Sequence, residues 1–393
     1  MKLLILLPRV PYPLEKGDKL RAFYQLKELS KYHEIYLIAL NRGVLHPEAK
    51  AKVMPFCKRI DFLDLPIIRQ AFGVVRAFLL GLPLQCGFFY SSKIKRKIRE
   101  IIDEVKPDHI YCQMIRVAEY VKLLPIPKTI DYQDVLSKGM QRRSEKTSPL
   151  LKPFFQMEYR RLKRYEAEIF SYFDHKTIIT GVDREFIDHP NNYEIEIIAN
   201  GVDFEKYQSS QNEKIYDLIF SGNMAYPPNI YAAEYLARQI FPLLKQQFPD
   251  LKLAIVGANP VARVQALANE SITITGWVDS MPEYYAKSKV FIAPMTLGTG
   301  LQNKLIEAMA MRLPCVTSSL AGKPLAGVEN GKDIIICETL TGYVGAVSLL
   351  LSNEEQYHKI AENGHEVACF SYFTCSGKKI WEIAVKCSSS CMN

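Results

Sequence analysis

Short apolar runs alternate with helical patterns along the first half of the chain. The runs are MKLLILL, EIYLIAL, HIYCQM, KTIDYQD and HKTIITG, and patterns of helical period lie between them over residues 19–32, 93–105 and 153–173. Strands that alternate with helices predict a parallel sheet covered on both faces. We therefore expect a first doubly wound α/β domain over residues 1–198.

A second series of the same kind follows the polar segment ANGVDFEKYQSSQNEKI, where an Asn-Gly pair and broken periodicity predict a linker. Its apolar runs are YDLIFSG, LKLAIVG, SITITG, KVFIAPM, LPCVTSS and DIIIC, with helical patterns over residues 229–248, around Glu307 and over 341–351. These predict a second doubly wound domain over residues 199–368. Residues 369–393 are expected to form a helical tail that packs back toward the first domain.

The composition is that of an ordinary globular protein long enough for two domains, with 48% hydrophobic and 23% charged residues in 393. No apolar run is long enough to span a bilayer. The first run stops at Pro8 with no cleavage site behind it, so we interpret it as a buried strand and expect a cytoplasmic protein. Nine cysteines without a paired CxxC array suit reduced core thiols, and we expect no metal and no cofactor.

The formal net charge of +8 is concentrated in clusters, at SSKIKRKIRE, at Arg142 and Arg143, and at YRRLKRYE. Each cluster alone is typical of a solvated helix face. Beside the apolar and aromatic residues 76–90, they together indicate a peripheral contact with anionic lipid at the inner face of the plasma membrane. Nucleic acid is not expected as a partner, because no nucleic-acid-binding motif accompanies the charge.

A Gly-Thr-Gly turn is the most specific feature, since the run KVFIAPM leads through GTGLQNK straight into a helix. Such a turn aims backbone N–H groups and the positive end of a helix dipole at one point, which suits a phosphate. By itself, a glycine turn of this kind is common in doubly wound proteins. Here Lys304 and Glu307 lie three apart on one helix face, so that face can hold both a phosphate and a ribose.

Further loops are predicted to converge on this turn. FSGNMAYPPN, IVGANP and ITGWVDSMPEYY each follow a strand, and their Gly and Asn residues tolerate tight turns and a close ligand. Trp277 and Val278 could form an apolar wall for a planar base. The first strand leads into PRVPYPLEKGD and not into GxGxxG, which argues against a dehydrogenase.

Candidate catalytic residues lie at strand ends of the first half. Gly17 and Asp18 occupy the turn after the first strand, and Arg21 follows on the first helix. Gln113 and Arg116 come from DHIYCQMIRVAEY, while IDYQDVLS offers the further acids Asp131 and Asp134. A helix cap is the alternative for Asp18, and core or surface ion pairs are the alternative for Gln113, Arg116, Asp131 and Asp134.

The order of these motifs resembles the nucleotide-sugar half of family-4 retaining glycosyltransferases, which have the two-Rossmann-domain architecture called GT-B. The motifs are NGVD, FSGNMxYxPN, IVGANP, TGWVDSMPEYY and GTGLQNKLIEAMAMxLPxVT, and the start LPRVPYPLEKGDKLRAFYQLKELS resembles bacterial exopolysaccharide sugar transferases of that family. The resemblance implies two Rossmann-like doubly wound parallel-sheet domains facing across a cleft. The first would bind the acceptor and the second the donor.

The resemblance also implies roles for individual residues. Glu307 would bind the ribose hydroxyls of the donor. The amides of Gly300, Leu301 and Gln302 would hold the donor phosphate, Lys304 could add a cation to it, and Gly222 and Asn223 would border the diphosphate and the sugar. Gly17, Gly257 and Thr299 are further candidate donor-binding residues. The chain departs from the family pattern at Thr299, where an acid is common, and in lacking a basic pair after the first strand of the second domain. Lys304, or Arg9, Lys19 or Arg21 from the other domain, would then supply that charge.

The function implied is transfer of a hexose, with retention, from a nucleotide diphosphate sugar to a polysaccharide or lipid-linked acceptor in cell-surface polysaccharide biosynthesis. Helix dipole, turn amides and lysine can neutralise the leaving diphosphate without a metal. A nucleotide-sugar epimerase of the same architecture and a catalytically silent binding scaffold are the alternatives.

Overall fold

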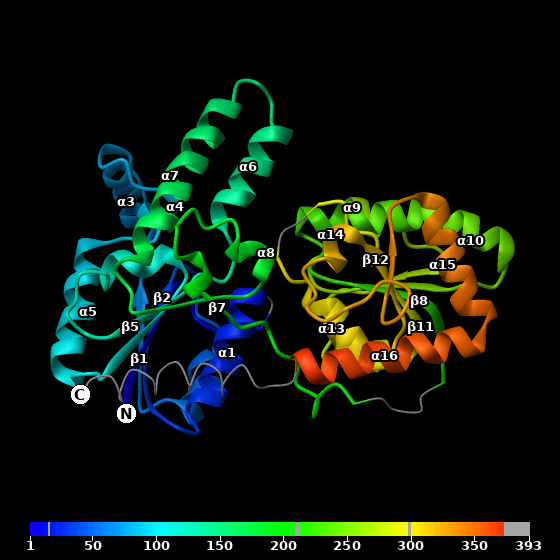
Figure 1. Cartoon of the computed structure of the whole chain (residues 1–393), viewed down its shortest axis with the longest axis horizontal. Coiled ribbons are helices and arrows are strands. Elements are labelled where there is room, and N and C mark those ends of the chain that lie inside the picture. The colour runs from blue at the N-terminus through cyan, green and yellow to red at the C-terminus, as the bar shows by residue number, and fades with distance from the viewer. Residues whose placement is uncertain (15, 209–212, 298–299, 373–393) are drawn as a thin grey trace. The chain divides into compact units, whose positions relative to one another are not determined.

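The computed structural model describes residues 1–14, 16–208, 213–297 and 300–372, which belong to two compact units (Figure 1). The first unit contains Met1–Ile198 and the second begins at Ala199. The predicted tail of residues 369–393 lies, beyond residue 372, outside the described residues. None of the described helices combines the length and the apolar character needed to cross a membrane.

The first unit contains a parallel sheet of seven strands in the order β3-β2-β1-β4-β5-β6-β7 (Figure 1). The strands are β1 (Lys2–Leu7), β2 (Glu34–Asn41), β3 (Arg59–Asp64), β4 (His109–Gln113), β5 (Lys128–Asp131), β6 (His175–Ile178) and β7 (Glu196–Ile197). The α-helices are α1 (Gly17–Leu29), α2 (Ala49–Val53), α3 (Ile67–Leu79), α4 (Leu84–Phe88), α5 (Ser92–Val105), α6 (Leu136–Lys146), α7 (Lys152–Phe170) and α8 (Gly181–Arg184). Short 3-10 turns lie at Met54–Phe56, Ile115–Tyr120 and Asn192–Glu194.

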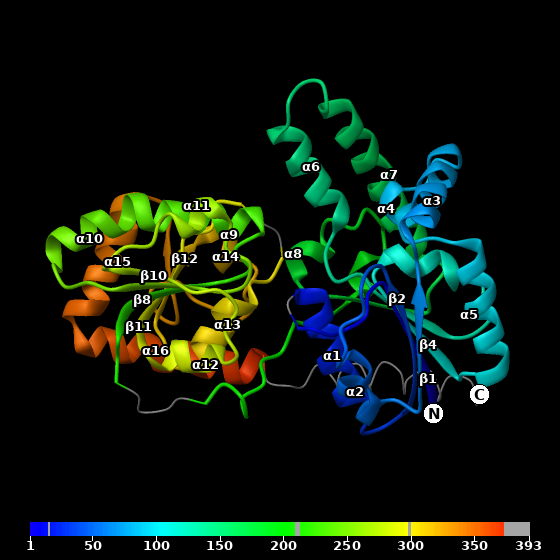
Figure 2. The ribbon, with the colours of Figure 1, turned by 180° about the vertical axis from the view of Figure 1, so that it is seen from behind.

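Both faces of the sheet are buried at its central strands, which is why β1 and β2 are largely apolar in sequence. In β1, Leu4 and Leu6 point to the layer that holds α5 and α7, while Leu3, Ile5 and Leu7 pack with α1 and α2 on the other face. Figures 1 and 2 show α6 and α7 as an antiparallel pair.

The second unit contains a parallel sheet of six strands in the order β10-β9-β8-β11-β12-β13. The strands are β8 (Tyr216–Ser221), β9 (Leu253–Val256), β10 (Ile272–Ile274), β11 (Ser288–Ala293), β12 (Cys315–Ser318) and β13 (Ile335–Cys337). The helices are α9 (Pro227–Tyr235), α10 (Phe241–Gln247), α11 (Ala262–Gln265), α12 (Met281–Ala286), α13 (Asn303–Ala310), α14 (Ser319–Gly322), α15 (Leu340–Ser352) and α16 (Glu354–Tyr372). Helices α9 and α10 cover one face of the sheet, and α13 and α16 cover the other (Figure 2).

The predicted fold class is confirmed: both units are doubly wound parallel α/β sheets of the Rossmann type. The predicted helix over residues 229–248 is present, and it contains a π-helical stretch, Leu236–Ile240, between α9 and α10. Pro242 in the first turn of α10 has no N–H to donate, and the wider π turn accommodates that loss. Sequence reasoning also missed β3, β7, α3 and α6.

Candidate functional site

The second unit has a topological switch point between β8 and β11. From β8 the chain moves outward to β9 and β10, whereas β11 begins a second series, through β12 and β13, on the other side. Ligands of open parallel sheets bind beside the carboxyl ends of the strands at such a point. The loop after β8 starts with Gly222, and the loop after β11 leads through Gly300 into α13. The tertiary structure thus brings the two most specific sequence motifs to one place.

Gly222 and Gly257 bring the loops after β8 and β9 into backbone contact. The amide of Gly222 donates to the carbonyl of Val256 at 3.0 Å. A Cβ atom on Gly257, whose φ is +147°, would lie only 1.8 Å from the carbonyl oxygen of Gly222. Position 257 therefore requires glycine, and the two residues form a backbone floor next to the switch point.

Lys304 points from the first turn of α13 toward that floor. Its Nζ donates to Oδ1 of Asn229 at 2.6 Å and lies 4.6 Å from the centroid of the Phe220 ring. The Asn229 amide in turn donates to the carbonyl of Asn223 at 3.0 Å. Burial lowers the pKa of Lys304 to about 7, and the charge of Glu307 opposes that shift only in part. An anion bound here would restore the ammonium charge.

Glu307 lies one turn further along α13 and is held by tyrosines. The hydroxyl of the buried Tyr285 donates to Glu307 Oε2 at 3.1 Å and lies 2.9 Å from Ser221 Oγ. Burial raises the pKa of Glu307, while hydrogen bonds from Tyr285 and Tyr207 and the charge of Lys206 stabilise its ionised form. This half-buried carboxylate is therefore fixed in orientation and keeps acceptor capacity for hydroxyl groups.

Sequence reasoning named Lys304 and Glu307 but missed the residues that orient them. Asn229 lies in the first turn of α9 and Tyr285 lies on α12. Both are remote from the glycine turn in sequence. The motif MPEYY was available as a signal for Tyr285, because it follows a strand of the same sheet. For Asn229, the signal was its position as a polar residue directly after the two prolines of FSGNMAYPPN.

The remaining predicted donor residues of the second unit lie in the loops after β10 and β11. Gly300 has a φ of +74°, and Leu301 and Gln302 directly precede α13, whose first-turn amides have no partner within the helix. Trp277 is 61% exposed, while Val278 packs partly against the core. Thr299 lies outside the described residues, so its predicted role stays a prediction.

In the first unit, Asp18 and Gln113 lie close together, and Arg9 joins them. Arg9 forms an ion pair with the carboxylate of Asp18, and the Gln113 side chain donates to the backbone carbonyl of Asp18 at 3.3 Å. Helix α1 starts at Gly17 with Lys16 as its cap residue, which makes no side-chain capping bond. The alternative of Asp18 as the N-cap therefore does not describe this helix, since the carboxylate binds Arg9 instead.

Arg21 is buried and occupied by structural contacts. Its Nε donates to Asp131 Oδ2 at 2.7 Å and its Nη1 to the carbonyl of Ile198 at 2.9 Å. Tyr111 and Thr177 also donate to the carboxylate of Asp131, at 2.9 and 3.1 Å. We therefore assign Arg21 to holding α1 on the sheet, and its predicted contact with substrate has no support in this geometry.

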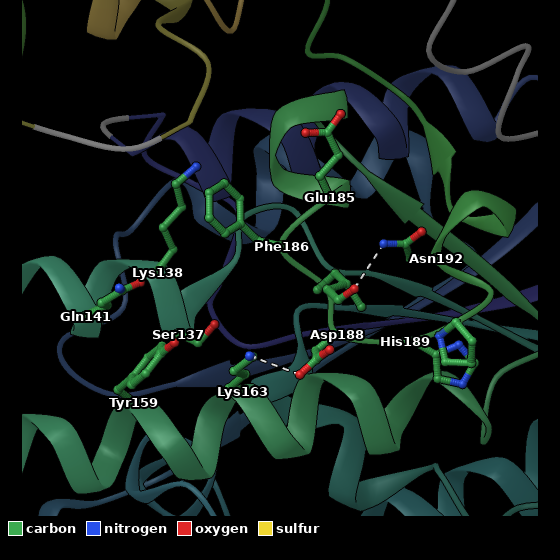
Figure 3. A pocket seen from close by; sticks show the side chains of 12 residues that line it. Ser137, Lys138, Gln141, Tyr159, Lys163, Glu185, Phe186, Asp188, His189 and Asn192 are labelled. Atoms are coloured by element: carbon green, nitrogen blue, oxygen red, sulfur yellow. Dashed lines mark hydrogen bonds and ion pairs between the residues drawn. The ribbon is translucent and has the colours of Figure 1, made fainter.

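Two further features of the first unit follow the carboxyl ends of β5 and β6. Burial, and then the neighbouring charge of Asp183, raise the pKa of Asp134 to about 7, a value that suits an acid–base group. A pocket of about 520 Å³ lies between α6, α7 and the segment after α8 (Figure 3). Lys163 and Asp188 pair across it at 3.0 Å, and Lys138 lies over the Phe186 ring. The basic cluster YRRLKRYE of the sequence analysis contains two of the lining residues, Tyr159 and Lys163, but the pocket itself was not predicted.

Comparisons with known proteins give the class. Residues 216–353 match the family model described as "Glycosyl transferases group 1". The chain is 24% identical over 362 residues to an uncharacterized 44.6 kDa protein in the cps region of Klebsiella pneumoniae, covering 85% of this chain and 87% of that protein. It is similar in structure to sucrose-phosphate synthase from Thermosynechococcus elongatus, with a TM-score of 0.71, 12% identity and coverage of 99% and 100%. It is also similar to Anabaena HepE in complex with UDP-glucose, with a TM-score of 0.69, 14% identity and coverage of 98% and 99%.

The fold is that of the GT-B glycosyltransferases, as the sequence motifs predicted. Within the second unit, residues 216–353 are similar to the group 1 glycosyltransferase domain.

Proposed function

We propose that this protein transfers a hexose, with retention, from a nucleotide diphosphate sugar to a polysaccharide or lipid-linked acceptor, as a family-4 enzyme of cell-surface polysaccharide synthesis. The observation that carries the proposal is the placement of Lys304 and Glu307 one helical turn apart at the switch point of the second unit. The UDP-glucose bound to HepE and the cps-region origin of the Klebsiella pneumoniae relative support the donor and the pathway.

The chemistry follows from where the positive charge lies. When the bond between sugar C1 and the diphosphate oxygen breaks, negative charge develops on the diphosphate, and Lys304 with the first-turn amides of α13 would stabilise it. Retention follows if the acceptor hydroxyl attacks from the face that the diphosphate leaves. The acceptor oxygen then bonds to C1, and its proton passes to a departing phosphate oxygen. No metal is needed in this scheme.

Donor binding tests the proposal directly. We expect Glu307→Ala to abolish measurable binding of nucleotide diphosphate sugars in calorimetric titration, because the ribose hydroxyls lose a fixed, ionised acceptor. Glu270→Ala is the matched control, since Glu270 is an exposed acid of the same unit. Unchanged donor affinity in Glu307→Ala, with the fold intact by circular dichroism, would refute the site.

Product analysis distinguishes a retaining glycosyltransferase from an epimerase and from a binding scaffold. Retention predicts that the new linkage keeps the anomeric configuration of the donor, which one-dimensional proton NMR reports, and that turnover survives EDTA. An isomerised donor formed without any acceptor would instead indicate an epimerase. Absence of nucleoside diphosphate release with every donor and acceptor would indicate a binding scaffold.

We also propose that helix α3 docks the protein on an anionic membrane. Large side chains of α3 and its cap are more than half exposed, namely Ile67, Ile68, Phe72, Val75, Phe78, Leu79 and Leu80. The small residues Gly73 and Ala77 face inward, and a Cβ atom on Gly73 would lie 2.1 Å from the carbonyl oxygen of Gly87 in α4. The apolar side of this helix is therefore turned outward, which marks an interaction surface.

The positive charge around α3 favours an anionic partner. Residues 65–99 contain seven Lys and Arg and no Asp or Glu. Arg161 and Arg164 of α7 donate to the carbonyls of Phe78 and Gly81 at the end of α3, at 3.3 and 2.6 Å. An apolar face with basic residues beside it matches an anionic lipid surface, with the charge near the head groups and the apolar side chains below them.

Vesicle binding tests this surface. The double variant Phe72→Ser, Leu79→Ser should bind vesicles of phosphatidylglycerol and phosphatidylcholine at least about tenfold more weakly, because two large apolar side chains no longer leave water. Leu123→Ser is the control, since Leu123 is 71% exposed elsewhere in the unit. Equal binding by the double variant, or a loss of self-association in its place, would contradict membrane docking.

A further inference from the structure

Three arginines gather at the switch point of the first unit. In its sheet, β1 leads outward to β2 and β3, whereas β4 begins the series β5, β6 and β7 on the other side. Arg9, Arg42 and Arg116 each follow the carboxyl end of one of the adjacent strands β1, β2 and β4. This is the edge at which a parallel sheet presents its ligand site.

An aromatic platform holds two of these arginines. The Arg42 guanidinium carbon lies 4.3 Å from the Phe88 ring centroid and 4.7 Å from that of Phe89, and the Arg116 guanidinium carbon lies 5.4 Å from the same Phe89 ring. Nη2 of Arg116 also donates to Gln85 Oε1 at 2.8 Å. Both guanidinium groups are thus oriented by α4 and its cap before any ligand arrives, which lowers the entropic cost of binding.

Two of the three guanidinium groups have no ion-pair partner. Asp18 pairs with Arg9, whereas no carboxylate among the described residues forms an ion pair with Arg42 or Arg116. Among the described residues, Nε of Arg42 and Nε of Arg116 are buried without a hydrogen-bond partner. Burial, with the charges of Arg9 and Arg42, lowers the pKa of Arg116 to about 10, and burial and Arg9 also lower the pKa of Arg42. Unsatisfied, mutually repelling donors are costly unless an anion relieves them.

We propose that Arg9, Arg42 and Arg116 bind a phosphate or diphosphate group of the acceptor. The negative charge of a phosphoryl group can be neutralised by the two guanidinium groups that lack an ion-pair partner, and paired guanidinium groups suit its oxygens. The identification of the ligand as the acceptor rests on the proposed glycosyl transfer, whereas the anion site itself does not depend on it. If both hold, the acceptor of this enzyme is a phosphate-bearing saccharide or saccharide lipid.

Binding of inorganic pyrophosphate to the full chain tests the site. The titration is made in a Lys304→Gln background, because the donor site of the second unit also attracts phosphate. We expect Arg42→Gln to weaken pyrophosphate binding about 10- to 100-fold, and Arg99→Gln, at an exposed arginine of α5, to leave it unchanged. Equal affinity in Arg42→Gln, or no pyrophosphate binding at all in the Lys304→Gln background, would overturn the site.

Two comparisons identify the role and the ligand chemistry. With Lys304 intact, Arg42→Gln should leave the donor Kd unchanged and raise the acceptor KM. A weaker donor with unchanged pyrophosphate binding would make the cluster a donor clamp, which overturns this inference and leaves glycosyl transfer standing. If the protein binds no nucleotide sugar but its pyrophosphate binding depends on Arg42, the anion site is supported and the proposed function is rejected. Tighter binding of glucuronate than of methyl phosphate would refute a phosphate ligand.

Discussion

The charge state of Lys304 should make donor binding depend on pH. In the free protein burial lowers the pKa of Lys304 to about 7, and a bound diphosphate would return it toward the ordinary lysine value near 10.4. Binding is then coupled to uptake of a proton. The diphosphate of a nucleotide sugar is fully ionised throughout the neutral range, so its own charge does not vary.

The magnitude follows from the fraction of the ammonium form. With a free pKa of 7 and a bound pKa well above 8.5, the apparent Kd for donor should rise about 25-fold between pH 6.5 and 8.5. Calorimetric titration in buffers of different ionisation enthalpy should show uptake of about one proton at pH 8. Lys304→Met should bind donor weakly and without this slope, whereas Lys252→Met, at an exposed lysine of the same unit, should keep it.

The stability of the free protein should change in the opposite direction. The folded pKa of Lys304 lies below its unfolded value, so the unfolded chain binds more protons between pH 7 and 10 and the free energy of unfolding rises with pH. Because Lys304 is partly exposed, we expect roughly 1 kcal/mol between pH 7 and 8.5 in urea titrations. A donor affinity that is flat from pH 6.5 to 8.5, or an equal slope in Lys304→Met, would refute the reasoning.

Two further predictions concern the frame of each unit. Asp131→Asn leaves the buried Arg21 charge without its counter-ion and should lower the free energy of unfolding of the first unit by about 3–5 kcal/mol in urea titrations; a loss below about 1 kcal/mol would show that the pair is dispensable. Gly257→Ala places a methyl group 1.8 Å from the Gly222 carbonyl oxygen and should cost about 1–3 kcal/mol and weaken donor binding, whereas Gly345→Ala, in open space on α15, should stabilise by up to about 1 kcal/mol. Equal thermal shifts for the two glycine variants would contradict the packing argument.

The strands and the donor turn could be predicted because their signals are local. A strand that is buried on both faces of a parallel sheet is a continuous apolar run in sequence, and glycine at a strand end indicates a tight loop. Helix α3 was missed for the opposite reason. Its large side chains face outward and Gly73 faces inward, so the pattern is that of an inverted amphipathic helix. Strand β3 is only half-buried, which weakens its apolar signal.

The partners of the functional groups could not be predicted, because they are remote in sequence. Arg21 and Asp131 are 110 residues apart, and Lys304 and Asn229 are 75 apart. No local pattern shows whether a charged residue finds a buried partner. For Arg21 the partner exists and gives it a structural role, whereas Arg42 meets two phenylalanine rings and other positive charges.

The sequence by itself determined the two parallel sheets, the glycine turn before α13 and the identity of Lys304 and Glu307, because each depends on residues close together in the chain. The tertiary structure decided what those residues meet. Strand order places the loops after β8 and β11 at one switch point, and it places Arg9, Arg42 and Arg116 at another. Charge, hydrogen bonding and pKa depend on distances in space, which only the packed sheets and helices set.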